Sequence, residues 1–122
     1  MPEKYPLFVY GTLCGGQAMS EILETHPRTT AQTRGTLFRM PAGYPALSLT
    51  GEQIIYGELI EHINPTQFSV LDFYEGVHSQ LYSREIIDVQ VGLKPVRAWA
   101  YVMERPKQKG GIRIPSGKWI PS

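Results

Sequence analysis

The sequence predicts a mixed α+β domain, in which a small, mainly antiparallel β-barrel is flanked by two short helices. Three observations favour this fold class. Five or six β-prone segments are spread over the 122 residues, and only two segments show helical spacing of apolar residues. Strands and helices also do not alternate regularly, as they do in parallel α/β folds. The length is most simply that of one domain, spanning residues 1–122.

The first predicted strand and the first predicted helix lie close together near the start of the chain. Residues 5–10, "YPLFVY", are short, aromatic and β-branched and stop at Gly11, which is typical of a buried strand. In Gln17–Glu24, "QAMSEILE", apolar residues recur at helical spacing, and Pro27 prevents continuation. We therefore expect a short helix directly after the glycine-rich turn.

The middle of the chain is predicted to be extended. Thr29–Met40 favours β structure through its threonines and aromatics, with Gly35 as a bulge or a point of close backbone approach. Residues 41–49, "PAGYPALSL", indicate a turn leading into another extended segment. Residues 54–63 alternate between apolar and polar from Tyr56 onward, so they predict a separate, half-buried strand.

The second predicted helix begins after that strand. Asn64 can cap it, with Pro65 in its first position, and about three turns then fit before Gly76. Glu75 falls at the end of this helix.

Two further β runs and a tail complete the chain. Tyr82–Val91 and Pro95–Glu104 are separated by "GLK", which is short enough for a hairpin connection. Residues 105–122 are rich in Pro, Gly and Lys, which predicts an irregular C-terminal tail anchored by Ile112, Ile114 and Trp119. A tail that instead serves as a docking module for a protein partner is the alternative interpretation.

Composition and charge limit the classes of partner. A formal net charge of +1 argues against a broad surface for nucleic acid or anionic lipid, and favours a small polar substrate. The single cysteine, Cys14, excludes an internal disulfide framework and leaves zinc without its usual thiolates, so no metal is expected. Because no apolar run approaches the ~18 residues of a membrane span and the first residues lack a signal-peptide core, we expect a cytoplasmic protein.

The residues that follow the first strand are one candidate site. Glycines such as Gly11 let backbone N–H groups turn toward an anion or a developing oxyanion, although a plain turn has the same appearance. Glu75, between an aromatic residue and a glycine, is either a proton shuttle or an ordinary solvated residue at a helix end. Cys14 is either a nucleophile or, more simply, a small filler, since no histidine stands in a recognisable relation to it.

Four motifs in order resemble the gamma-glutamylcyclotransferase-like family: "VYGTL" at 9–13, "LDFYEG" at 71–76, "YSRE" at 82–85 and "AWAYVM" at 98–103. They extend from Phe8 to about Met103, so they cover most of the chain. The resemblance implies a small barrel whose cavity accepts a gamma-glutamyl group, and a reaction that needs no cofactor. In that reaction the substrate's own α-amine attacks its γ-carbonyl, releasing the attached amine and forming pyroglutamate.

The family's site residues carry over position by position. Glu75 matches the catalytic acid/base, and Tyr82 and Tyr101 match aromatic pocket positions. Arg84 follows the family's Y-x-R pattern, where it either stabilises the sheet or pairs with a neighbouring carboxylate. The substrate-binding loop is matched by Tyr10, Gly11, Thr12 and Leu13.

Two points stay open at the level of the sequence. Cys14 occupies a position that is commonly basic in bacterial-type members, a departure that bears on the substrate. A protein that binds a small amide or amino acid in the same cavity without turnover is the main alternative to an enzyme. We expect a monomer or weak homodimer with a small gamma-glutamyl substrate as its partner, and no nucleic acid or membrane.

Overall fold

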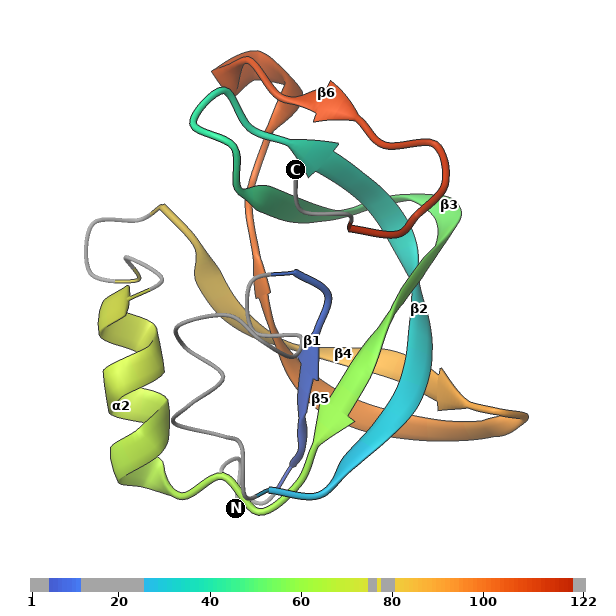
Figure 1. Ribbon diagram of the computed structural model, residues 1–122, viewed down its shortest axis with the longest axis vertical. Helices are drawn as coiled ribbons and strands as arrows, with labels where there is room; N and C mark the ends of the chain where they lie inside the picture. Colours follow the sequence, from blue (N-terminus) through green and yellow to red (C-terminus); the bar gives the residue numbers. More distant parts are fainter. Residues whose placement is uncertain (1–4, 12–25, 75–76, 78–80, 120–122) are drawn as a thin grey trace.

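The computed structural model describes residues 5–11, 26–74, 77 and 81–119 (Figure 1). Its elements are β1 (Leu7–Val9), β2 (Arg28–Arg39), β3 (Pro45–Ile60), α2 (Pro65–Tyr74), β4 (Ser83–Val91), β5 (Lys94–Val102), the 3-10 helix η3 (Lys107–Lys109) and β6 (Ile112–Arg113). The helix predicted over Gln17–Glu24 lies outside the described residues.

Five strands close into a barrel. They are ordered β3-β1-β5-β4-β2, and β2 pairs back onto β3, while β6 extends the sheet at β2. The β1–β5 pair is parallel, whereas the other pairs of adjacent strands are antiparallel. The predicted mixed, mainly antiparallel barrel is therefore confirmed. Within the described residues α2 is the only α-helix, so the second flanking helix is not confirmed.

Alternate residues of the strands face two separate cores, as the two-residue period of a strand requires. In β1, Phe8 joins one buried cluster, while Leu7 and Val9 join the other. All five barrel strands contribute to the first cluster, which therefore fills the barrel interior; it contains Phe8, Tyr10, Ala31, Leu37, Leu47, Ile55, Leu59, Ile87, Val89, Ala98, Ala100 and Val102.

The second core lies between the barrel and α2, which runs alongside the barrel wall (Figure 1). The helix contributes Phe68 and Leu71, both fully buried, and they pack in the same cluster as the outward-facing residues of β1 and Tyr101 of β5. Burial of a side chain as large as Phe or Leu stabilises the fold by about 2 kcal/mol each. This packing fixes α2 against β1 and β5.

The helix begins as the sequence predicts. The N–H of Gln67 donates to Oδ1 of Asn64 at 2.7 Å, and Oε1 of Gln67 accepts from the Asn64 N–H at 3.1 Å. This reciprocal pair is a capping box, and Pro65 occupies the first helical position. No helix in the described part of the chain is long and apolar enough to cross a membrane.

The β2–β3 pair contains an irregularity at Gly35. Gly35 pairs with Gln53 and the next residue, Thr36, pairs with Ser48, so Leu49–Glu52 of β3 bulge out of the ladder. A Cβ on Gly35 would lie 2.4 Å from the carbonyl oxygen of Ser48, which confirms the predicted close backbone approach. The prediction of two separate segments was wrong, because β3 continues through this bulge from Pro45 to Ile60.

The tail, predicted to be irregular, includes η3 and β6 in its described part. Ile114 is half-buried and donates its N–H to the Leu37 carbonyl, while Trp119 lies beneath the guanidinium of Arg39, 4.3 Å from Cζ to the ring centroid. The prediction that Ile112 anchors the tail was wrong, since it is 73% exposed.

Candidate functional site

The phenol of Tyr10 joins three strands where β1 ends. Its hydroxyl donates to the carbonyl of Tyr101 in β5 at 2.5 Å and accepts from the Leu47 N–H of β3 at 3.2 Å. Tyr10 is buried within the barrel core. These two bonds fix the backbone at the point where the predicted substrate-binding loop begins.

Gly11, the next residue, lies directly against β3. A Cβ at this position would stand 2.2 Å from Cγ of Pro45, so only glycine allows the approach. Tyr82 reaches the same place, because its hydroxyl donates to the Pro45 carbonyl. Tyr10, Gly11 and Tyr82 therefore converge on the first residues of β3.

A second cluster holds the C-terminal part of α2. Asp72 accepts from Arg84 at both carboxylate oxygens, with Nε at 2.9 Å from Oδ1 and Nη2 at 3.3 Å from Oδ2. Oδ1 also accepts from the Tyr101 hydroxyl at 2.7 Å. Both members of the ion pair are largely shielded, with side chains 18% and 19% exposed. This fork-to-fork pairing is the strongest geometry available to a carboxylate and a guanidinium.

Two aromatic rings flank the guanidinium of Arg84. Its Cζ lies 4.4 Å from the ring centroid of Phe68 in α2 and 4.4 Å from that of Trp99 in β5. Such cation–π contacts add to the ion pair where water is excluded. Of the two interpretations of Arg84, pairing with a neighbouring carboxylate is the one seen. Asp72 is not among the predicted site residues, although one interpretation of the Y-x-R pattern at Arg84 was pairing with a neighbouring carboxylate.

Tyr101 connects the two clusters. Its backbone carbonyl receives the Tyr10 hydroxyl, and its own hydroxyl reaches Asp72. Four predicted site residues, Tyr10, Gly11, Tyr82 and Tyr101, thus belong to one network. Each of the three tyrosine hydroxyls donates a hydrogen bond to an oxygen of another residue. The network therefore holds the surrounding backbone in place.

The other predicted site residues, Thr12, Leu13 and Glu75, lie outside the described residues, as does Cys14. Their positions in the sequence still relate them to described residues. Thr12 directly follows Gly11, and Glu75 directly follows the last residue of α2, three positions after Asp72. Within the described ranges, no three His, Cys, Asp or Glu side chains gather as a metal site would require.

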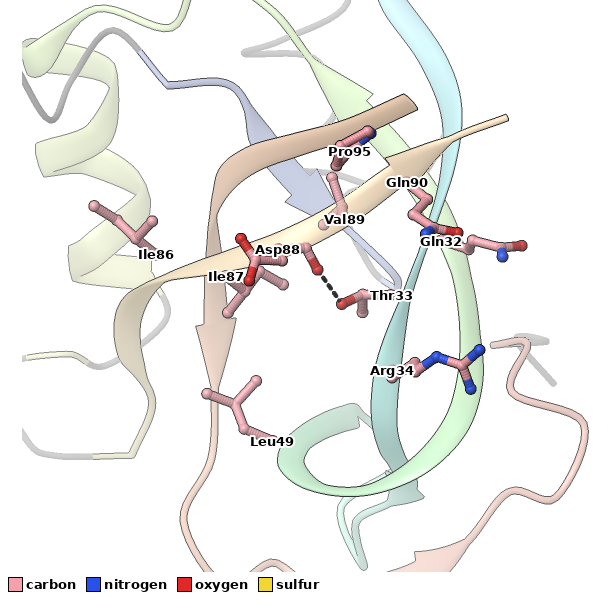
Figure 2. Close-up of a pocket in the computed structure, with 10 residues that line it drawn as sticks. All are labelled: Gln32, Thr33, Arg34, Leu49, Ile86, Ile87, Asp88, Val89, Gln90 and Pro95. Carbon is pink, nitrogen blue, oxygen red and sulfur yellow. Dashed lines mark hydrogen bonds between the residues drawn. The ribbon is translucent and has the colours of Figure 1, made fainter. Parts of the chain in front are cut away.

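A pocket of about 430 Å³ opens elsewhere, between β2 and β4 (Figure 2). None of the predicted site residues lines it. Its lining residues are Gln32, Thr33, Arg34, Leu49, Ile86, Ile87, Asp88, Val89, Gln90 and Pro95.

Solved structures share this fold. YkqA from Bacillus subtilis is 28% identical, with a TM-score of 0.74 over 94% of this chain, but the chain spans only 39% of the length of YkqA. An AIG2-like protein from Mus musculus is 24% identical, with a TM-score of 0.69 over 84% of this chain and 80% of the mouse chain. A structure described as gamma-glutamyl cyclotransferase is 17% identical, with a TM-score of 0.66 over 82% of this chain and 66% of the other.

A search of curated protein sequences finds no match. The sequence profile of one family, described as "Gamma-glutamyl cyclotransferase, AIG2-like", matches residues 7–121, which is nearly the whole chain. With the barrel and the converging motif residues, this match establishes that the chain belongs to the gamma-glutamyl cyclotransferase, AIG2-like family.

Proposed function

We propose that this protein cleaves a gamma-glutamyl amine or gamma-glutamyl amino acid by intramolecular cyclisation, releasing pyroglutamate and the free amine. The substrate's α-amine forms a new C–N bond to its own γ-carbonyl carbon, and the original amide C–N bond breaks. Nucleophile and electrophile belong to one molecule, so the protein's main task is to hold the substrate in a near-attack shape.

Glu75 is the proposed proton carrier. An ammonium group cannot attack a carbonyl, so a base must first remove its proton, and the same group can then protonate the departing nitrogen. The backbone N–H groups of the loop at Gly11, Thr12 and Leu13 are the proposed donors to the oxygen on which negative charge develops. Loss of one such donor typically costs about 10²–10³ in rate.

One observation carries the proposal. The backbone that leads into the loop, at Tyr10 and Gly11, and the end of α2 that leads into Glu75 are both held by a network that meets at Tyr101. A rigid shared base of this kind is what a loop of donors and a carboxylate need to face one substrate. Family membership, and a structural neighbour described as gamma-glutamyl cyclotransferase, support the same chemistry.

The test is to incubate the purified protein with a panel of gamma-glutamyl amines and gamma-glutamyl amino acids and to measure pyroglutamate by mass spectrometry. We expect turnover of at least one substrate, and we expect Glu75→Gln to lower it by about 10²–10⁴-fold because the proton carrier is lost. Glu104→Gln is the matched control, since Glu104 is exposed just beyond β5 and should leave the rate unchanged.

Circular dichroism should show that both variants are folded. Substantial turnover by a folded Glu75→Gln protein would rule out the assigned proton carrier. Binding of the panel without pyroglutamate from any member would instead identify a non-catalytic ligand-binding protein.

A further inference from the structure

We propose that Asp72 and Arg84 are positioning residues for the reaction, which fix the direction in which α2 delivers Glu75 to the substrate. This inference rests on the proposed function, in which Glu75 carries the proton. It assigns a part in that reaction to two side chains that act through Glu75.

The buried core does not extend to the end of α2. Phe68 and Leu71 are fully buried, but Phe73 is 73% exposed, so Leu71 is the last core residue in the described part of the helix. Glu75 directly follows the last helical residue, and consecutive Cα atoms are only about 3.8 Å apart. The contacts of Asp72, which lies between Leu71 and Glu75, therefore restrict where Glu75 can stand.

Asp72 is held from two neighbouring strands. Nε and Nη2 of Arg84, in β4, each reach one carboxylate oxygen, and the Tyr101 hydroxyl, in β5, reaches Oδ1. A planar guanidinium fixes the plane of a carboxylate as well as its distance, which the single ammonium of a lysine does not. The last turn of α2 therefore has a defined orientation on the barrel.

Arg84 contacts the helix at two places. Its guanidinium pairs with Asp72, and its Cζ lies 4.4 Å from the ring centroid of Phe68, four residues earlier in the same helix. Residues four apart lie on one face of a helix. The ring of Trp99 in β5, also 4.4 Å from Cζ, holds the guanidinium on the barrel side. Two contacts along one face fix the tilt of α2 as well as its distance from β4 and β5.

The ion pair is not optimised for stability. Nη1 of Arg84 is buried and has no hydrogen-bond partner in the described part of the chain, and an unsatisfied buried donor costs free energy. Shielded ion pairs are often matched in stability by uncharged residues of similar volume. A pair with this deficit is better explained by the orientation that it imposes on α2.

The experiment compares the parent protein with a neutral pair, Asp72→Asn combined with Arg84→Met, on a gamma-glutamyl substrate that the parent turns over. Removing both charges leaves no buried charge unpaired, and the amide oxygen introduced at position 72 can still accept from Tyr101. Urea denaturation should therefore show a folded protein close to the parent in stability. We expect kcat to fall by about 10²-fold with KM little changed, because a small misplacement of a reacting group has this effect.

Two comparisons distinguish positioning from general damage. Asp88→Asn combined with Arg97→Met makes the same replacements in the exposed ion pair between β4 and β5, and should leave kcat unchanged. The neutral pair is also placed in a Glu75→Gln protein and measured with enzyme in excess over substrate. There it should lower the residual rate by less than about twofold, because residues that act through one group are not additive.

A folded neutral pair that keeps the parent's kcat overturns the inference, as does a loss of rate that is equally large with and without the Glu75 carboxylate. If the neutral pair does not fold, Arg84→Lys takes its place. It keeps the charge without the fork and should lower kcat about tenfold, so an undiminished rate would again overturn the inference. Absence of pyroglutamate from the parent protein overturns the proposed function itself, and the inference falls with it.

Discussion

Tyr101 contributes to the site with both its main chain and its side chain. It is 3% exposed, its carbonyl accepts the Tyr10 hydroxyl, and its hydroxyl donates to Asp72. A carboxylate that accepts several hydrogen bonds is held in one orientation, because each donor restricts it. Movement of Asp72 would therefore disturb the end of α2 and the start of the loop together.

Asp72→Asn is predicted to lower the free energy of unfolding by about 3 kcal/mol, since it leaves a shielded guanidinium without its counter-charge. Urea denaturation monitored by circular dichroism measures the change. Asp88→Asn is the matched control, because the Asp88–Arg97 pair is exposed and longer, at 3.7 Å, and should change stability by less than about 1 kcal/mol.

A double-mutant cycle with Tyr101→Phe isolates the hydroxyl's bond to Asp72. The two changes should be non-additive by about 1 kcal/mol, as expected for side chains in direct contact. If Asp72→Asn cost no more than Asp88→Asn, the network would not hold the end of α2.

At the scale of one element, α2 is held at both ends by side chains. Asn64 and Gln67 cap its start, and Nε2 of Gln67 lies 3.1 Å from Nε2 of His26, whose Nδ1 lies 2.7 Å from the Glu61 carbonyl oxygen. The ion pair of Asp72 with Arg84 holds the last turn. The helix therefore has a fixed direction as it approaches Glu75.

Asn64→Ala is predicted to reduce the free energy of unfolding by about 1 kcal/mol, because the Gln67 N–H loses its acceptor. Thermal and urea unfolding curves measure the loss. Asn64→Asp keeps a good N-cap and should remain close to the parent protein. Equal losses in both variants would show that the capping bond to Gln67 is not the stabilising contact.

Local signals in the sequence allow some of these features to be predicted. The Asn64 cap and the close approach at Gly35 depend on residues whose backbone preferences act over a few positions. The continuity of β3 was missed because Gly51, which has a φ of +95°, and its polar neighbours have the composition of a turn. In the structure they form a bulge, and β3 pairs with β2 on both sides of it.

The family motifs single out Tyr10 and Tyr101, whereas the contacts that join these residues to Asp72 and Arg84 could not be predicted from them. Asp72 and Arg84 lie on a helix and a strand, and only the packing of α2 on β5 brings them together around Phe68 and Trp99. No local periodicity encodes such a contact. The same holds for the pocket between β2 and β4, which depends on where two distant strands stop pairing.

At the scale of the whole molecule, the tail packs against the barrel that the five strands close. The side-chain amide of Gln53 donates to the carbonyls of Ile114 and Pro115, at 2.7 Å each. The N–H of Tyr56 donates to the Gly117 carbonyl at 2.9 Å, so the tail follows β3 along its exposed edge. These contacts join residues more than 50 positions apart, which indicates that the tail contributes to the fold.

Deletion of all residues after Arg105 is predicted to lower the free energy of unfolding by about 3–5 kcal/mol, because several hydrogen bonds to β2 and β3 and the Arg39–Trp119 contact are lost at once. Circular dichroism and urea unfolding of the truncated chain measure it. Ile112→Ser serves as the control, since this exposed side chain should matter by less than about 0.5 kcal/mol. A truncated protein as stable as the full chain would contradict a structural tail and favour the docking-module interpretation, since a segment that adds nothing to stability while presenting Trp119 needs another reason to be ordered.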